Sequence, residues 1–211
     1  MFNNDSIVIV CYPPWSGGKF LINCLALSND CYFQDLAYVK RQRAGLLPSQ
    51  EKFNLLNSEL DLVSDSWNDL RMGCAQLFTQ ADDPSKFDPV ITELANESKL
   101  FFVVAHKVKE FDKLRQIWPR ARIIFFQENN RFLTWRCKHT GTATKFHSEF
   151  GNMDDKIVWH ADYCLDPDVF LIKLKELYQK LMLPDFNESL VFDFYSRYMS
   201  TLKFLEHDLS N

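Results

Sequence analysis

The residues best suited to chemistry form a short turn, Ser16-Gly17-Gly18-Lys19, between two apolar segments. Glycine adopts positive φ at low cost and lets the backbone approach a ligand closely, so successive N–H groups of such a turn can point into one concavity. A helix that begins there adds the positive end of its dipole, while Lys19 adds a full charge and Ser16 a hydroxyl donor. This pattern predicts a site for phosphate or sulfate. The alternative is an ordinary glycine turn between a strand and a helix.

The turn differs from a Walker A loop at two positions that matter for nucleotide hydrolysis. Pro13 stands where the first glycine of that loop belongs, and Phe20 stands where its magnesium-binding hydroxyl belongs. The pattern therefore argues against a nucleoside triphosphatase. A small-molecule or nucleotide kinase that uses the same turn stays open as a weaker alternative.

Apolar runs that alternate with helix-like segments must position this turn. Runs at residues 7–11, 100–105 and 121–126 are typical of neighbouring parallel strands buried on both faces, and residues 157–159 are a candidate fourth strand. Expected helices cover residues 19–27, 111–118, 166–183 and 187–205, with polar-faced helices within 48–79, a loop at 82–89 and a helix start at 130–138. This alternation predicts a three-layer α/β/α fold around a mainly parallel sheet of four or five strands. Ligands of such sheets bind at the carboxyl ends of the strands.

Size and charge limit the classes of protein and of ligand. The chain has 211 residues, 46% of them hydrophobic, which is enough for one substantial core and short for two. We therefore expect a single domain over residues 1–211. The net charge is −4, but the stretch from Lys99 to His147 holds eleven basic and three acidic residues, which leaves −12 for the rest. A basic third of an acidic protein suggests an anionic ligand rather than nucleic acid; a solvated basic face is the alternative.

Cysteine usage and the apolar runs bear on the compartment. The six cysteines are scattered, with no C-x-x-C pair and no zinc-like spacing, which predicts free thiols in a reducing environment and no metal site. The first residues lack the basic region of a signal peptide, and the longest apolar runs are too short to span a bilayer. These features predict a cytoplasmic protein without a membrane span.

The stretch YPPWSGGKF, from Tyr12 to Phe20, resembles the 5′-phosphosulfate loop of sulfotransferases. In that family a strand runs into Tyr-Pro, a lysine, Ser-Gly, two hydroxyl residues and an aromatic residue. Tyr-Pro, Ser-Gly and the aromatic Phe20 match, with one residue inserted. Trp15 stands at the position of the family's lysine, and Gly18 and Lys19 stand at the hydroxyl positions, so that Lys19 supplies charge from the other side of the loop.

A second resemblance lies at the end of the run KLFFVVAH. Cytosolic sulfotransferases end the corresponding strand in Lys-Thr-His, and that histidine is the catalytic base. Ala105 replaces the threonine, while His106 matches the histidine. An imidazole, which titrates near neutral pH, can take the proton of an acceptor hydroxyl as the oxygen attacks sulfur. The alternative is a polar residue at a strand end that hydrogen-bonds a neighbour.

The segment WPRARIIFFQENNRFLTWR resembles the family's 3′-phosphate strand and helix, in which Arg-Asn follows the strand and a serine lies in the helix. Asn129 matches the asparagine, Glu128 stands at the arginine, and Arg136 stands at the serine. A carboxylate repels a 3′-phosphate, whereas the guanidinium groups of Arg131 and Arg136 suit phosphate oxygens. If Glu128 faces the 3′-phosphate, the donor site has lapsed. If Arg131 or Arg136 faces it instead, the donor site works.

The stretch KIVWHADYCLDPDVFLIKLKELYQKLMLPDF resembles the family's last strand, its acidic-Pro turn and the helix that follows. The resemblance thus covers nearly the whole chain except residues 40–98, where acceptor-binding helices usually vary. It implies a divergent sulfotransferase of P-loop NTPase-like fold that moves a sulfuryl group from 3′-phosphoadenosine 5′-phosphosulfate to a hydroxyl or amine without a metal. The resemblance also implies that His106 and Lys19 are catalytic residues. The donor-binding residues that it implies are Pro14, Trp15, Ser16, Gly17, Gly18, Lys19, Phe20, Asn129, Arg131 and Arg136.

One further function fits these residues besides the kinase. It is a protein of the same fold that binds a nucleotide or anion without catalysis, and Glu128 is its best support. The partners expected for the enzyme are an anionic nucleotide and a small-molecule or carbohydrate acceptor. Trp15, Trp135 and Trp159 are candidates to stack on a sugar or base, although aromatic residues at such spacing more often belong to a core.

Overall fold

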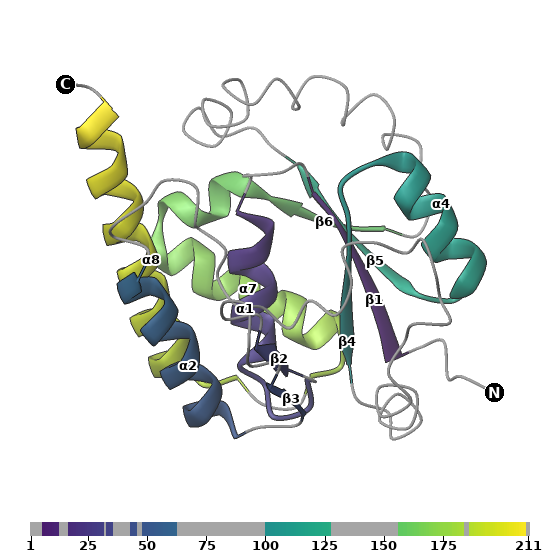
Figure 1. Ribbon diagram of the computed structural model, residues 1–211, viewed down its shortest axis with the longest axis horizontal. Coiled ribbons are helices and arrows are strands. Elements are labelled where there is room, and N and C mark those ends of the chain that lie inside the picture. The colour runs from purple at the N-terminus through teal and green to yellow at the C-terminus, as the bar shows by residue number, and fades with distance from the viewer. Residues whose placement is uncertain are drawn as a thin grey trace. The chain divides into compact units, whose positions relative to one another are not determined.

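The computed structural model describes residues 6–12, 17–31, 33–35, 43–45, 48–62, 100–127, 156–183 and 186–209 (Figure 1). The strands are β1 (Ile7–Cys11), β2 (Phe33–Asp35), β3 (Arg43–Gly45), β4 (Phe101–Ala105), β5 (Arg122–Gln127) and β6 (Lys156–His160). The helices are α1 (Gly18–Ala26), α2 (Ser49–Leu62), α4 (Val108–Ile117), a 3₁₀ helix (Ala161–Leu165), α7 (Pro167–Lys180) and α8 (Glu188–Leu209).

The chain divides into two compact units. The first, which we call the sheet unit, comprises Met1–Gly18 and Gln76–Asp166, and the second, the helical unit, comprises Lys19–Ala75 and Pro167–Asn211. Each unit is therefore built from two separate stretches of the sequence. The single domain expected from chain length stays a prediction.

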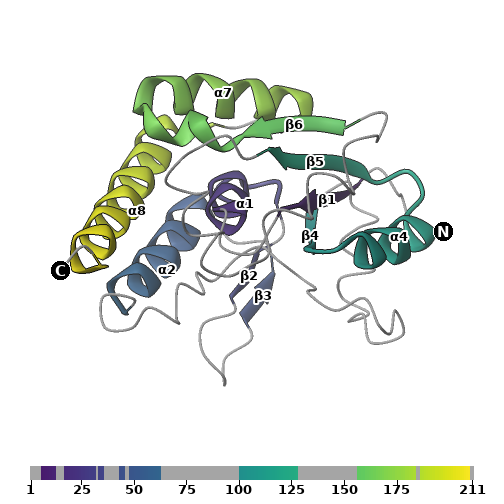
Figure 2. The same cartoon turned by 90° about the horizontal axis from the view of Figure 1, so that it is seen from above.

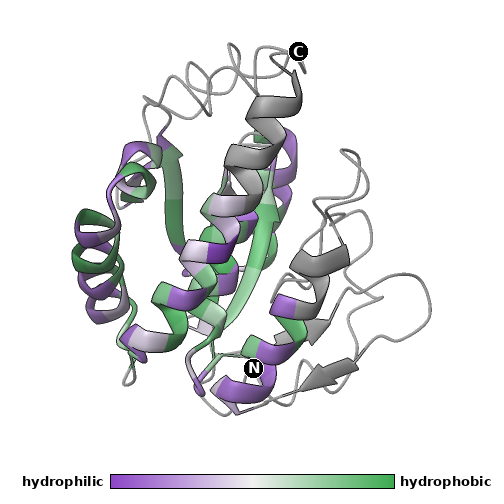
Figure 3. Cartoon of the chain, turned by 90° about the vertical axis from the view of Figure 1, so that its left-hand side faces the viewer, coloured by the Kyte–Doolittle hydropathy of each residue, from purple (hydrophilic) through white to green (hydrophobic). Residues whose placement is uncertain are grey.

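The sheet unit contains a parallel four-stranded sheet in the order β4-β1-β5-β6 (Figure 2). In β1 every residue is buried, as its continuous apolar run IVIVC predicts for a central parallel strand. Of the two strands at the edges of the described sheet, β4 is also fully buried, whereas most of β6 is half-buried. Strands of the sheet are coloured mainly as hydrophobic in Figure 3. The α/β fold, the parallel sheet and the neighbouring positions of β1, β4 and β5 are confirmed.

Helix α4 packs against β1 and β4 of the sheet unit. Its buried residues Phe111 and Leu114 are three positions apart and share one helix face, while Lys109, Asp112 and Lys113 are exposed. The predicted helix at 111–118 is confirmed, although it begins earlier, at Val108.

The core of the helical unit is aromatic. The ring of Phe20 in α1 stacks on Phe170 of α7 and on Phe194 and Tyr198 of α8, with centroid distances of 5.5, 5.5 and 4.0 Å. Helix α2 lies beside α8, and α7 also packs on α8 (Figure 2). The helices predicted at 166–183 and 187–205 are confirmed, and α2 falls within the predicted polar-faced segment.

Some parts of the chain differ from the prediction or lie beyond it. Strands β2 and β3 form an antiparallel pair that was not predicted, because three-residue strands are too short to show an alternating pattern. The loop predicted at 82–89 and the helix start at 130–138 lie outside the described residues.

Two further findings concern the described part alone. None of its helices has both the length and the apolar character needed to cross a bilayer. Its four cysteines, Cys11, Cys24, Cys31 and Cys164, are buried free thiols.

Helix α7 ends in a turn that suits glycine better than the residue present. Leu183 N–H donates to the Tyr178 carbonyl and Met182 N–H to the Gln179 carbonyl, as in a Schellman motif, with Met182 at φ 56°. A side chain in this left-handed conformation costs about 1 kcal/mol. Met182→Gly should therefore raise the free energy of unfolding by about 1 kcal/mol, measured by urea denaturation.

Met182→Ala is the matched control for this prediction. The Met182 side chain is 78% exposed, so its removal alone costs little, and alanine keeps the strained backbone. Equal stability of the alanine and glycine variants would show that the backbone conformation carries no strain.

Candidate functional site

The connections of the sheet mark one point at its carboxyl edge. From β1 the chain continues to β4 on one side, whereas from β5 it continues to β6 on the other side. β1 and β5 are thus adjacent strands whose carboxyl-end connections lead in opposite directions. Open α/β sheets bind ligands at such a switch point, because the two loops separate and leave room between them.

His106 stands at this carboxyl edge, directly after β4, and contacts the residue that follows β1. Its Nδ1 lies 2.9 Å from the backbone oxygen of Tyr12, and the rings of Tyr12 and His106 meet edge to face with centroids 4.7 Å apart. Tyr12 N–H in turn donates to the Ala105 carbonyl at 3.2 Å, so the strand pairing continues one residue beyond β1. His106 is half-buried.

The backbone of His106 is held from the other side by α4. The backbone N–H of His106 donates to Glu110 Oε2 at 2.8 Å, and Glu110 lies in the first turn of that helix. The Glu110 carboxylate accepts a hydrogen bond from the backbone N–H of His106 and also interacts favourably with the positive end of the helix dipole. Glu110 was not among the site residues predicted from the sequence, although a carboxylate four residues after His106 at a helix start is a recognisable signal.

Gly17 and Gly18 each have a separate reason to be glycine. Gly17 has φ 87°, the positive value predicted for the turn. A methyl group on Gly18 would overlap the first ring atoms of Tyr12, which is itself 2% exposed. The close approach predicted at Gly18 is therefore made by an internal aromatic ring.

Lys19 and Phe20 follow Gly18 in the chain and belong to the helical unit. Lys19 is half-buried in the first turn of α1. Phe20 is 1% exposed, and its ring is fully used in the aromatic core described above. Core packing alone explains an aromatic residue at this position, and the donor-binding roles of both residues stay predictions.

Several residues that the sequence singles out lie outside the described part of the chain. They are Pro14, Trp15, Ser16, Glu128, Asn129, Arg131, Trp135 and Arg136. Of the three candidate stacking tryptophans, Trp159 is described: it is 1% exposed and packs edge to face on Tyr163. Trp159 therefore belongs to a core.

The two thiols described in the sheet unit, Cys11 and Cys164, are unsuited to nucleophilic chemistry. Burial raises the pKa of Cys11, the last residue of β1. Burial and, to a lesser extent, the nearby Asp162 raise the pKa of Cys164 to about 12. Both sulfurs stay protonated near neutral pH, and the thiolate is the reactive form.

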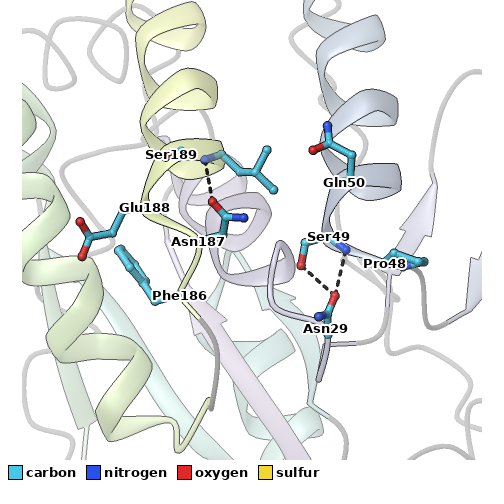
Figure 4. Close-up of a pocket in the computed structure, with 9 residues that line it drawn as sticks. Asn29, Pro48, Ser49, Gln50, Phe186, Asn187, Glu188 and Ser189 are labelled. Atoms are coloured by element: carbon cyan, nitrogen blue, oxygen red, sulfur yellow. Dashed lines mark hydrogen bonds between the residues drawn. The ribbon is translucent and has the colours of Figure 1, made fainter.

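A cavity of about 680 Å³ lies in the helical unit, and none of the predicted site residues lines it (Figure 4). Two of its polar side chains cap helices: Asn29 Oδ1 accepts from the N–H and hydroxyl of Ser49, and Asn187 Oδ1 accepts from Leu190 N–H. These bonds account for part of its polar lining. Within the described ranges, no group of three or more His, Cys, Asp or Glu side chains gathers as a metal site would require.

No protein-family model matches the chain, and no curated protein is significantly similar to it in sequence.

Proposed function

We propose that this protein transfers a sulfuryl group from 3′-phosphoadenosine 5′-phosphosulfate to a hydroxyl or amine of an acceptor. The observation that carries the proposal is the orientation of His106 at the carboxyl edge of the sheet. A carbonyl oxygen only accepts hydrogen bonds, so the contact between Tyr12 O and His106 Nδ1 requires a proton on Nδ1. In the neutral ring, Nε2 then carries the lone pair and is the atom that can act as a base.

In the proposed reaction, His106 Nε2 takes the proton of the acceptor hydroxyl as that oxygen bonds to sulfur. The bond between sulfur and the 5′-phosphate oxygen breaks, and 3′-phosphoadenosine 5′-phosphate leaves with the electron pair. The transferred group is anionic, so most of the catalysis comes from positioning and from fixed positive charge, as in phosphoryl transfer. The turn from Ser16 to Lys19 is the proposed source of that charge.

The finer fold assignment belongs to the same proposal. A three-layer sulfotransferase-like fold of the P-loop NTPase type is supported by the order β4-β1-β5-β6, in which β1, the first strand of this sheet, lies between β4 and β5. Further support comes from the glycine turn that directly joins β1 to α1.

Calorimetry with two nucleotides tests the proposal. We expect 3′-phosphoadenosine 5′-phosphate to bind more tightly than ATP. Tighter binding of ATP would favour the kinase, and binding of neither nucleotide would contradict the proposal.

A binding protein without catalysis is the second candidate, and Glu128 at the position of the family arginine favours it. Like charges about 4 Å apart repel by about 4 kcal/mol at an effective dielectric of 20, enough to offset much of a nucleotide's affinity. This candidate predicts that 5′-AMP binds as well as, or better than, 3′-phosphoadenosine 5′-phosphate. Preference for the 3′-phosphorylated nucleotide would argue for a working donor site.

Lys19→Ala should weaken binding of 3′-phosphoadenosine 5′-phosphate by roughly tenfold or more. A hydrogen bond to a charged group contributes about 1.5–3 kcal/mol, and about 1.4 kcal/mol corresponds to tenfold in affinity. The measurement is calorimetric titration of both proteins at one salt concentration. Lys180→Ala, at the end of α7, is the matched control, because it removes the same charge from the same unit. Equal affinities of the Lys19 and Lys180 variants would place the ligand elsewhere.

A further inference from the structure

Tyr12 contacts the ring of His106 in two different ways. The backbone oxygen of Tyr12 accepts the Nδ1–H bond at 2.9 Å, and the aromatic ring of Tyr12 packs against the imidazole at an interplanar angle of 87°. The first contact selects the tautomer, and the second limits rotation of the imidazole about its side-chain bonds. Neither contact uses Nε2.

Tyr12 is itself held from two sides. Its backbone is fixed by the bond from its N–H to the Ala105 carbonyl, one residue before His106. Its ring occupies the space that a side chain at position 18 would need, and the overlap would involve the ring atoms nearest Cβ, which cannot swing away independently. The conformation of the glycine turn and the position of the Tyr12 ring are therefore mutually dependent.

We propose that Tyr12 is a positioning residue that couples the glycine turn to His106. The turn keeps the Tyr12 ring in place, the ring and the carbonyl of Tyr12 keep His106 in the Nδ1–H form, and Nε2 is thereby left as the base. The catalytic meaning of this arrangement rests on the proposed function, whereas the arrangement itself requires no ligand. A substitution of Gly18 should therefore change the tautomer of His106, 88 residues further along the chain.

Long-range ¹H–¹⁵N spectra of the histidine rings test this proposal in the protein without ligand. The chain has five histidines, and the His106 signals are assigned by their loss in His106→Gln. At a pH where the ring is neutral, we expect a single tautomer with the proton on Nδ1 in the wild-type protein. Gly18→Ala should cause loss of that single form and give a mixture of both tautomers. The Nε2–H tautomer in the wild type would overturn the proposal.

Substitutions of Tyr12 separate the coupling from a general loss of structure. Tyr12→Phe keeps the ring and the carbonyl and should leave the His106 signals in the wild-type form. Tyr12→Val removes the ring and should give the mixture, and adding Gly18→Ala to it should cause no further change, because no ring is left to displace. A further change in the double variant would overturn the proposed route. His160, at the end of β6, is the internal control whose signals should stay constant in all variants.

These outcomes are distinguishable from failure of the proposed function. The tautomer is measured without donor, acceptor or turnover. An Nδ1–H tautomer that is lost in Gly18→Ala would therefore support the proposed coupling even if no nucleotide binds. The amide signals of the sheet show whether Gly18→Ala folds. If it does not fold, the proposal is still tested by the wild-type tautomer and by the comparison of Tyr12→Phe with Tyr12→Val. An unchanged tautomer in Tyr12→Val would overturn the role of the ring.

Discussion

His106→Gln should lower sulfuryl transfer by roughly a hundredfold or more while leaving the affinity for 3′-phosphoadenosine 5′-phosphate near the wild-type value. A general base contributes about 10²–10⁴-fold, and its loss affects the transition state rather than donor binding. Glutamine keeps a hydrogen-bonding side chain of similar length but cannot accept the proton. The measurement combines calorimetry with turnover on a panel of phenols, sugars and amines.

His160→Gln is the matched control for this prediction. His160 also ends a strand of the parallel sheet and is also half-buried, but its ring contacts Tyr163 and not Tyr12. It should retain nearly full turnover. Comparable turnover of His106→Gln and wild type would make His106 a structural residue. No turnover of the wild type on the whole panel would favour the binding protein.

Lys52→Met should lower the free energy of unfolding by about 3 kcal/mol. Lys52 of α2 is 0% exposed, and its ammonium donates to the backbone oxygens of Ser28 and Cys31, which follow the end of α1. Methionine keeps the apolar stem but leaves both carbonyls without this donor, and an unsatisfied buried group costs about 1–3 kcal/mol. Urea unfolding followed by far-UV circular dichroism measures the loss, since α1, α2, α7 and α8 fall almost entirely within the helical unit.

The control for Lys52 is a lysine whose ion pair is exposed. Lys175 lies 3.1 Å from Glu188, and both side chains are more than half exposed. Exposed pairs contribute little, so Lys175→Met should change stability by no more than about 0.5 kcal/mol. If the two variants unfold at the same urea concentration, the buried bonds of Lys52 do not stabilise the fold.

Local sequence patterns were sufficient to predict most of the elements. Strands β1, β4 and β5 are continuous apolar runs, because the strands of a parallel sheet are covered on both faces and have no polar side. Helix α7 begins at Pro167 with Asp168 in its first turn, both of which are local start signals. The position of His106 at a strand end follows from the same patterns, since the residue after an apolar run is already at the edge of the sheet.

The contacts that define the candidate site and the helical core were decided by the tertiary structure. No sequence pattern relates Tyr12 to His106, because 94 residues separate them and only the pairing of β1 with β4 brings them together. Lys52 lies in a segment whose composition predicts a solvated helix face, yet it is buried, because the carbonyls after α1 provide acceptors for a charge that would otherwise stay in water. Local propensity is encoded in neighbouring residues, whereas the partner of a buried polar group is set by chain segments that meet only when the protein folds.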